Sequence, residues 1–212
     1  MKLRGRPPSI PEDDILDAAR ALFLLRGFDA TTAEIAERAG VSESIIFYRY
    51  KTKEALFAAV VEKLVAVPPL LERLGEHVGK GEMEETLFEV GAAMIAAMDQ
   101  VLPFMMMAWS SPTRLAQFCQ RMREPNPAHV RTIKLIAGYF DAEARAGRLR
   151  AVDPEILARG FLGGIIDYVM QQHLHGLDSL PMPAVTFLRG FVNILLDGAR
   201  SKTAAPERGS RR

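Results

Sequence analysis

Residues 15–61 read ILDAARALFLLRGFDATTAEIAERAGVSESIIFYRYKTKEALFAAVV, and they carry the clearest signals for the fold of the N-terminal part of the chain. Its apolar residues recur at helical spacing, and Gly27 is a stop signal for a first helix. Thr31 and Glu34 can form a capping box, in which each side chain accepts the other residue's backbone N–H. Ser42 and Thr52 are good N-cap residues for two more helices. The stretch therefore predicts four helices, over residues 12–26, 32–39, 43–49 and 53–67, with Pro68 and Pro69 breaking the last one.

The two short helices at 32–39 and 43–49 are separated by the tight turn Gly40-Val41-Ser42, which predicts a helix-turn-helix. In the second helix, Ile46 and Tyr50 are spaced by four residues and suit a buried side. The other side of that helix is expected to be exposed and carries Glu43, Ser44, Phe47 and Tyr48. A large apolar side chain such as Phe47 at a water-facing position suggests a surface that covers thymine methyl groups or sugars.

Several short motifs in residues 15–61 closely resemble the DNA-binding domain of TetR-type bacterial transcription regulators. They are Ala18-Ala19, Leu22-Phe23, Gly27-Phe28, Thr31-Thr32, Ile35-Ala36, Ala39-Gly40-Val41-Ser42, the aromatic cluster Phe47-Tyr48-Tyr50 and Lys51-Thr52-Lys53-Glu54. The resemblance implies that Thr31 or Thr32 touches a phosphate and that Lys53 holds another. It places the following residues on a recognition helix in the major groove, with the last two reaching bases or phosphates: Ser42, Glu43, Ser44, Ile45, Phe47, Tyr48 and Arg49.

Two positions depart from the family pattern and leave the operator sequence open. The family usually has Gly-Thr where this chain has Ser44-Ile45, and usually Tyr where it has Phe47. At Ile45 and Phe47 the chain therefore lacks a hydroxyl group that the family pattern has on the face that the resemblance places on DNA.

The formal net charge is only +1, so any nucleic-acid surface must come from local basic clusters. One cluster, Lys2, Arg4 and Arg6, lies in a Pro- and Gly-rich arm at residues 1–11. Arg4-Gly5-Arg6-Pro7 resembles the core of a minor-groove AT-hook, because extended Arg side chains fit the narrow groove of A·T tracts. An unstructured basic start explains the arm equally well.

The rest of the chain also has a helical pattern, so we expect an all-α fold. The expected domains are a basic arm (1–11), a helix-turn-helix domain (12–56), an effector-binding and dimerisation domain (57–200) and a disordered basic tail (201–212). Further helices are predicted over residues 83–98, 103–109, 113–122, 128–146, 154–175 and 184–199. The apolar stretch from Val90 to Trp109 contains Asp99 and Pro103, which favours two buried helices with a break over a membrane span.

The family resemblance implies that the larger domain dimerises. Helical stripes agree with this implication, although intramolecular core packing would give the same pattern. The candidate dimerisation residues are Phe161, Gly164, Ile165, Tyr168, Leu188, Phe191 and Leu195. Gly160, Gly163 and Gly164 would let a partner helix approach closely, and a dimer reads two half-sites.

The resemblance also implies a small-molecule pocket, and the composition offers candidates for its lining. Ten Met residues are many for this length, and methionine adapts to varied apolar ligands. The candidate lining residues are Phe88, Met94, Met98, Phe104, Met105, Trp109, Phe118, Met122 and Tyr139. Ordinary core packing is the alternative for each Met, and Arg114, Arg121, Arg123 or Asp167 could orient a ligand.

No catalytic or metal-binding pattern stands out in the sequence. His173 and His175 would diverge on a helix, and a lone cysteine such as Cys119 is more often a small packing residue than a redox sensor. We therefore expect no catalytic residue, cofactor or metal, and a cytoplasmic, non-membrane protein.

Together these features predict a homodimeric repressor that a small apolar effector releases from a palindromic operator. One alternative is a helical small-molecule-binding protein or enzyme with a vestigial DNA-binding motif. Another is a DNA-binding protein whose larger domain only dimerises.

Overall fold

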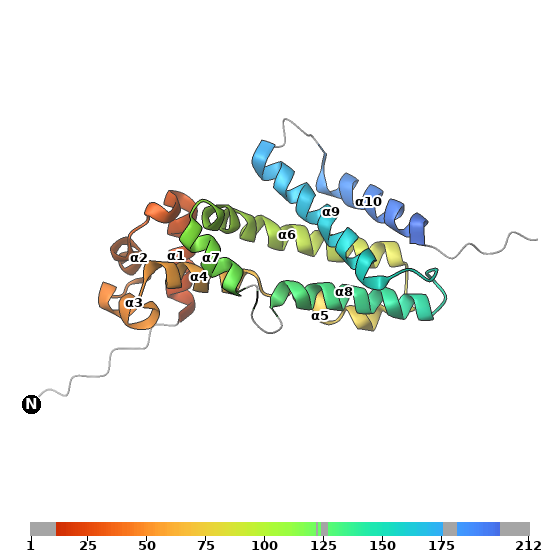
Figure 1. Cartoon of the computed structure of the whole chain (residues 1–212), viewed down its shortest axis with the longest axis horizontal. Helices are drawn as coiled ribbons and strands as arrows, with labels where there is room; N and C mark the ends of the chain where they lie inside the picture. Colours follow the sequence, from red (N-terminus) through yellow and green to blue (C-terminus); the bar gives the residue numbers. More distant parts are fainter. Residues whose placement is uncertain (1–11, 122, 124–126, 176–181, 200–212) are drawn as a thin grey trace, which may run out of the picture. The chain divides into compact units, whose positions relative to one another are not determined.

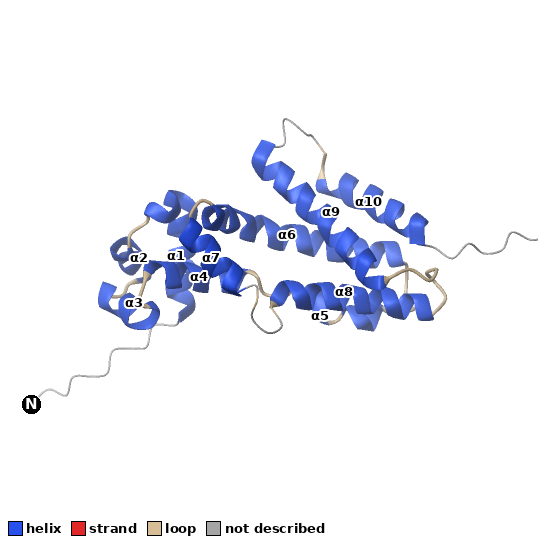
Figure 2. Ribbon diagram, in the orientation of Figure 1, coloured by secondary structure: helices blue, strands red, loops and turns tan. Residues whose placement is uncertain are grey.

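The computed structural model describes residues 12–121, 123, 127–175 and 182–199 (Figure 1). In this part of the chain the regular structure is helical and contains no β-strand (Figure 2), so the predicted all-α fold class is confirmed. The helices are α1 (Glu12–Arg26), α2 (Thr32–Ala39), α3 (Glu43–Tyr50), α4 (Lys53–Leu64), α5 (Pro69–Glu72), α6 (Met83–Trp109), α7 (Pro112–Arg121), α8 (Ala128–Arg145), α9 (Pro154–His175) and α10 (Ala184–Ala199), with 3-10 turns at Gly27–Asp29 and Leu74–His77.

The chain divides into two compact units. Unit 1 comprises Met1–Ala66 and Gln100–Glu124, and unit 2 comprises Val67–Asp99 and Pro125–Arg212. The helix-turn-helix therefore shares its unit with the end of α4, the C-terminal part of α6 and α7. The domain boundary expected from the sequence lies at residue 56, within α4, and stays a prediction.

The core of unit 1 is built where α1 meets α2 and α4. Apolar residues of α1 at helical spacing, including Ile15, Ala19 and Phe23, are fully buried. Phe57 of α4 makes an edge contact with Phe23, with the ring centroids 5.3 Å apart. Phe104 of α6 extends this aromatic cluster, because its centroid lies 5.8 Å from that of Phe57.

Helix α6 corrects one prediction from sequence. The helix runs unbroken through Pro103, where a break between two helices was expected. Proline removes one backbone hydrogen bond, but the residues around it, Val101, Leu102 and Phe104, are all buried and hold the helix in place. What changes along α6 is its set of neighbours, since its residues pass from unit 2 to unit 1 between Asp99 and Gln100.

Helix ends set by local signals agree closely with the sequence. Gly27, Gly40 and Gly147 have the positive φ expected at a helix stop. Asp153 caps α9, since its Oδ1 accepts from the N–H groups of Glu155 and Ile156 at 2.9 and 3.1 Å. The fourth helix ends at Leu64 rather than at residue 67, and a short helix beginning at Pro69 follows it.

Unit 2 is held together mainly by α8, α9 and α10. Ile136, Tyr139 and Phe140 of α8 are buried, as are Phe161 and Ile165 of α9. Helix α10 packs closely on α9 and α6 through two glycines. A Cβ added at Gly164 would lie 2.5 Å from Phe191 Cζ, and one added at Gly91 would lie 2.6 Å from Leu188 Cδ2.

Helix α6 is long and apolar enough to cross a membrane by length and composition alone. The core helix of a soluble protein passes the same test, and Leu87, Val90 and Phe104 of α6 are completely buried among the protein's own helices. One such helix is weak evidence for a membrane span.

Candidate nucleic-acid interface

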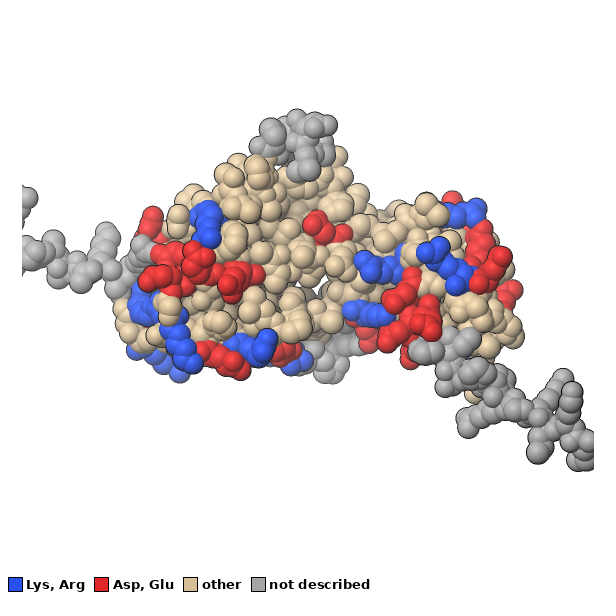
Figure 3. Space-filling view, turned by 180° about the vertical axis from the view of Figure 1, so that it is seen from behind, with Lys and Arg blue, Asp and Glu red and all other residues tan. Residues whose placement is uncertain are grey.

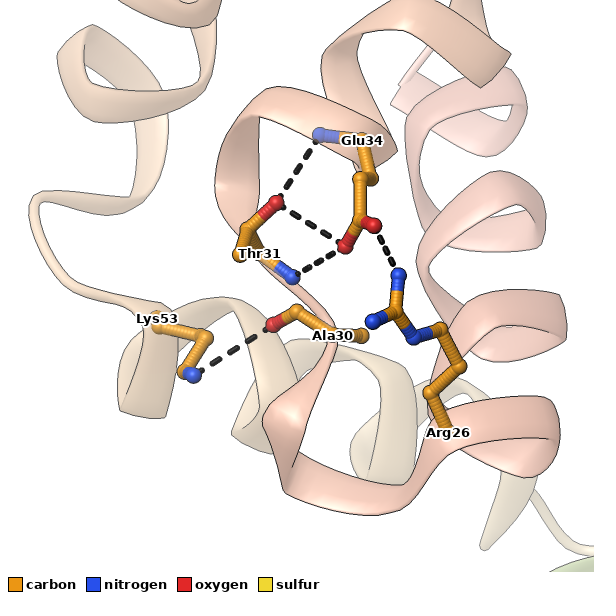
Figure 4. A network of polar contacts seen from close by, with 5 residues as sticks. All are labelled: Arg26, Ala30, Thr31, Glu34 and Lys53. Atoms are coloured by element: carbon orange, nitrogen blue, oxygen red, sulfur yellow. Dashed lines mark hydrogen bonds and ion pairs between the residues drawn. The ribbon is translucent and has the colours of Figure 1, made fainter.

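The start of α2 is fixed by the capping box predicted from sequence (Figure 4). Thr31 Oγ1 accepts from Glu34 N at 3.2 Å, and Glu34 Oε2 accepts from Thr31 N at 2.9 Å. Arg26, the last residue of α1, forms an ion pair with the same carboxylate. Hydrogen bonds from the Thr31 backbone and side chain, and the nearby Arg26 charge, lower the pKa of the Glu34 carboxyl. This network locks the N-terminus of α2 to the end of α1.

Lys53 braces the same region from the first turn of α4 (Figure 4). Its Nζ donates to Phe28 O at 2.7 Å and to Ala30 O at 3.3 Å, and it lies 4.4 Å from the centroid of the Phe28 ring. Two of the three ammonium donors are therefore used inside the unit. The third is available, so a phosphate contact by Lys53 stays a prediction.

The turn between α2 and α3 has the expected backbone. Gly40 takes the left-handed conformation with φ 68°, and Ser42 begins α3 as its N-cap residue. The Ser42 hydroxyl makes no capping hydrogen bond, however, because it pairs with the Ser44 hydroxyl at 2.8 Å. Ser42 and Ser44 are both exposed at the N-terminal end of α3.

Helix α3 has one buried and one exposed side. Ile46 and Tyr50 are buried, whereas Phe47 is 46% and Tyr48 is 77% exposed, as the spacing predicted. Ile45 is partly buried against the core of unit 1, which the list of groove-facing residues did not anticipate. Phe47 is thus a large apolar side chain held at the surface of the unit.

Tyr50 anchors α3 to α1 from the buried side. Its hydroxyl donates to Glu12 Oε1 at 3.3 Å. Burial, together with the Glu12 charge, raises the pKa of the Tyr50 hydroxyl to about 12, so it remains a donor at neutral pH.

Thr32 and Glu43 bind each other across the helix-turn-helix. Thr32 Oγ1 donates to Glu43 Oε1 at 2.5 Å, and Thr32 is buried. This bond sets α3 against α2. Thr31 is the more exposed of the two threonines proposed for a phosphate contact.

Charges of both signs are interspersed on the face of the molecule that Figure 3 shows, with no single broad basic patch in view. Arg4 and Arg6 of the arm lie outside the described residues. Of the expected DNA-contacting side chains on α3, Glu43, Ser44, Phe47 and Tyr48 are exposed, whereas Ile45 is partly buried.

The candidate pocket residues fall in both units. Phe104, Met105, Trp109 and Phe118 belong to unit 1, whereas Phe88, Met94, Met98 and Tyr139 belong to unit 2. Phe104 is completely buried and packs, like Phe118, against the helix-turn-helix core. Trp109 is 43% exposed, and Met122 lies outside the described residues. Core packing therefore describes Phe104, whereas Phe118 also lines a small cavity with Phe57 and Arg114.

The candidate dimerisation residues also need correction. Phe161, Ile165 and Leu188 are buried inside the chain, and Gly164 is covered by Phe191 of the same chain. Tyr168 is likewise engaged within the unit, because its ring stacks on Phe187 and its hydroxyl donates to Met182 O at 2.8 Å. Phe191 and Leu195 are partly buried. The apolar side chains that α9 and α10 expose are others, namely Ile156, Ile166, Leu174, Val185 and Ile194.

Sequence reasoning missed the role of Arg114, which it considered only as a possible ligand contact. The Arg114 guanidinium lies 4.1 Å from the centroid of Phe28, and its Nε donates to Met107 O at 3.1 Å. Two cations, Arg114 and Lys53, thus contact one aromatic ring. The lone signal was a basic residue on an amphipathic helix, which does not identify a partner so distant in sequence.

Cys119 is exposed rather than packed, and His173 Nε2 lies 3.3 Å from Asp99 Oδ1. Among the described residues, no group of three or more His, Cys, Asp or Glu side chains is placed to hold a metal ion.

Residues 15–60 match the model of a protein family described as bacterial regulatory proteins, tetR family. Over 186 residues the chain is 24% identical to the uncharacterized HTH-type transcriptional regulator YvkB of Bacillus subtilis, covering 87% of this chain and 94% of that protein. It is 27% identical over 192 residues to the HTH-type transcriptional repressor Rv1474c of Mycobacterium tuberculosis, covering 84% and 94%.

Solved structures share the fold. A protein from Mesorhizobium loti, described as of the TetR family, superposes with a TM-score of 0.74 at 20% identity, covering 89% of this chain and 96% of that chain. SmeT, the repressor of a multidrug efflux pump of Stenotrophomonas maltophilia, superposes with a TM-score of 0.63 at 18% identity, covering 96% and 97%.

Proposed function

We propose that this chain represses transcription by binding a palindromic operator as a homodimer. The match of residues 15–60 to the tetR family and the fold shared with TetR-family regulators support this proposal. We further propose that a small apolar effector releases it and that it acts in the cytoplasm. The relatives named above are transcriptional regulators and not enzymes, which supports a regulatory role.

The observation that carries the proposal is the exposed side of α3. Phe47 and Tyr48 stand out at the surface, while Ile46 and Tyr50 fix the helix from behind. Because α3 is held from its buried side, its exposed side can lie in a major groove with Ser44 and Phe47 toward the bases. The Phe47 ring can cover a thymine methyl group. The Thr31 hydroxyl donates to Glu34 Oε2 at 2.9 Å, so it would contact a phosphate by giving up that bond.

Exposed apolar residues on α9 and α10 support the dimer. Ile156 and Ile194 are 69% and 74% exposed, and a Cβ added at Gly160 or Gly163 would meet nothing within 4 Å. A second copy would cover these side chains and use the two glycines for a close helix approach. In such a dimer, the two recognition helices would read half-sites about 34–36 Å apart or a multiple of that distance.

The names of similar proteins support repression and effector control. Rv1474c is described as a repressor, and SmeT has been solved in complex with triclosan. In this chain, an effector that binds one arrangement of the dimer more tightly would shift the population away from the DNA-binding arrangement. Operator affinity would fall by the ratio of the effector's two affinities.

The test is fluorescence anisotropy of the purified protein on labelled DNA from upstream of its gene, with a scrambled competitor, at about 50 and about 200 mM salt. We expect competitor-resistant binding that weakens with salt. Phe47→Ala should change the ranking of operator variants at thymine positions. Leu25→Ala is the matched control, because Leu25 is 77% exposed on α1 and outside α3. If Phe47→Ala and Leu25→Ala rank all operators as the wild type does, Phe47 is not on the reading face.

A further inference from the structure

A cleft in unit 1 lies where α1, α4 and the C-terminal part of α6 meet. It encloses about 220 Å³ and is lined by Leu16, Asp17, Arg20, Val60, Lys63, Leu64 and Gln100. This volume would hold several water molecules, yet it is smaller than a site for a drug-sized ligand. The cleft therefore suits a molecule of a few heavy atoms.

The two cations in the cleft differ in how they are neutralised. Lys63 Nζ lies 2.9 Å from both Asp13 Oδ1 and Asp17 Oδ1. Hydrogen bonds to these carboxylates raise the pKa of the Lys63 ammonium. Arg20, by contrast, pairs with the neutral amide of Gln100, and no carboxylate contact to it is found among the described residues.

Arg20 also has a donor left over. Its Nη2 donates to Gln100 Oε1 at 3.3 Å, while its Nε is buried and has no hydrogen-bond partner in the described part of the chain. Nε and Nη2 form one edge of the planar guanidinium, and this edge matches the two oxygens of a carboxylate. Gln100 supplies one acceptor oxygen, whereas this edge of the Arg20 guanidinium offers two N–H donors, Nε and Nη2.

From these observations we propose that the cleft is a binding site for a small carboxylate. The carboxylate accepts from Nε and Nη2 of Arg20 and displaces the Gln100 amide. A short apolar remainder of the ligand packs against Leu16, Val60 and Leu64, which line the cleft. Occupancy replaces the hydrogen bond between α1 and α6 with two bonds to the ligand.

The experiment follows the Arg20 Nε–H signal by nuclear magnetic resonance in the ¹⁵N-labelled full chain, with Arg20→Lys identifying that signal. Sodium acetate and sodium butyrate are the probes, sodium chloride keeps the ionic strength constant, and acetamide is the neutral control. We expect a saturable shift with a dissociation constant of about 1–10 mM for acetate, tighter for butyrate because of its apolar chain. Acetamide should produce no saturable shift.

Gln100→Glu is the decisive variant, because it supplies a tethered carboxylate to the same edge. We expect it to move the Nε–H signal toward the acetate-bound position without added ligand and to weaken acetate binding at least tenfold. Gln100→Ala leaves the edge open and should bind acetate at least as well as the wild type. The proposal is overturned if acetate and acetamide act alike, if acetate gives no saturable shift, or if Gln100→Glu binds acetate as the wild type does.

Discussion

Replacing Gly164 by alanine tests whether this glycine serves packing within the chain rather than approach of a partner helix. The new Cβ would lie 2.5, 2.8 and 3.1 Å from three atoms of the Phe191 ring. That ring cannot swing away easily, because it stacks against Phe161 on α9 and Phe187 on α10, with centroids 6.1 and 5.3 Å away. Helix α9 or α10 must therefore move to admit one methyl group.

Two opposing effects set the expected change in unfolding free energy for Gly164→Ala. Overpacking of a fitted core costs about 1–3 kcal/mol, whereas alanine is favoured over glycine inside a helix by about 0.5–1 kcal/mol. We expect Gly164→Ala to lose about 0–2 kcal/mol of unfolding free energy. Gly138→Ala on α8 is the matched control, because nothing lies within 4 Å of its added Cβ, and it should gain about 0.5–1 kcal/mol.

The assay is urea unfolding followed by far-ultraviolet circular dichroism, with all three proteins at one concentration so that any dimer contributes equally. The two variants should differ by about 1–3 kcal/mol at similar m-values. Equal stabilisation by both substitutions would refute the argument, since it would mean that Phe191 leaves room for a methyl group. A loss confined to dimer affinity would instead return Gly164 to the partner interface.

Three further predictions follow from the ion pairs and caps. Glu34→Gln should lower the free energy of unfolding at about pH 7. Because its neighbours lower the pKa of the Glu34 carboxyl below 4.5, the difference in stability between wild type and variant should shrink as the pH falls below that value. A difference in urea midpoint that is the same at about pH 3 as at about pH 7 would contradict this prediction. Lys53→Met should lower the free energy of unfolding by about 1–2 kcal/mol, because the hydrogen bonds from Lys53 to two backbone carbonyls are lost. The same variant should reduce the slope of log DNA affinity against log salt concentration by about 0.9, and an unchanged slope would limit Lys53 to its structural role. Arg148→Met should lower the free energy of unfolding by about 1–3 kcal/mol in thermal unfolding, because the fully buried Glu143 carboxylate loses its ion-pair partner. Arg145→Met breaks an exposed ion pair and should change stability by under about 0.5 kcal/mol. Equal losses in the two variants would argue against a penalty for leaving the Glu143 charge unpaired.

The helix-turn-helix is the part of the fold that the sequence predicted best. The capping box at Thr31 and the left-handed Gly40 involve residues within a few positions of one another. Such short-range signals can be read without knowing the fold, because the partner of each group is already specified by spacing. The buried and exposed sides of α3 followed from the same local periodicity, with Ile46 inside and Phe47 outside.

Residues expected in the larger domain, 57–200, show what could not be predicted from the sequence. Composition placed Phe104 in a ligand pocket, but the ring belongs to the core of unit 1 beside Phe57, 47 positions earlier in the chain. Similarly, the apolar stripes of α9 and α10 predicted partner-facing residues, but Phe161, Ile165 and Leu188 are buried within the chain. A helix with apolar residues on more than one side can turn either side inward, and periodicity alone does not choose between them.

The all-helical class, the helix-turn-helix and the positions of most helix ends could be predicted from the sequence, because they depend on contacts between near neighbours in the chain. Three other features became visible only in the folded chain: α6 continues through Pro103, Gly164 makes room for Phe191, and Nε of Arg20 lacks a hydrogen-bond partner in a cleft. Each of these depends on which distant residues are brought together. That choice comes from the summed burial of many side chains, which no single motif encodes.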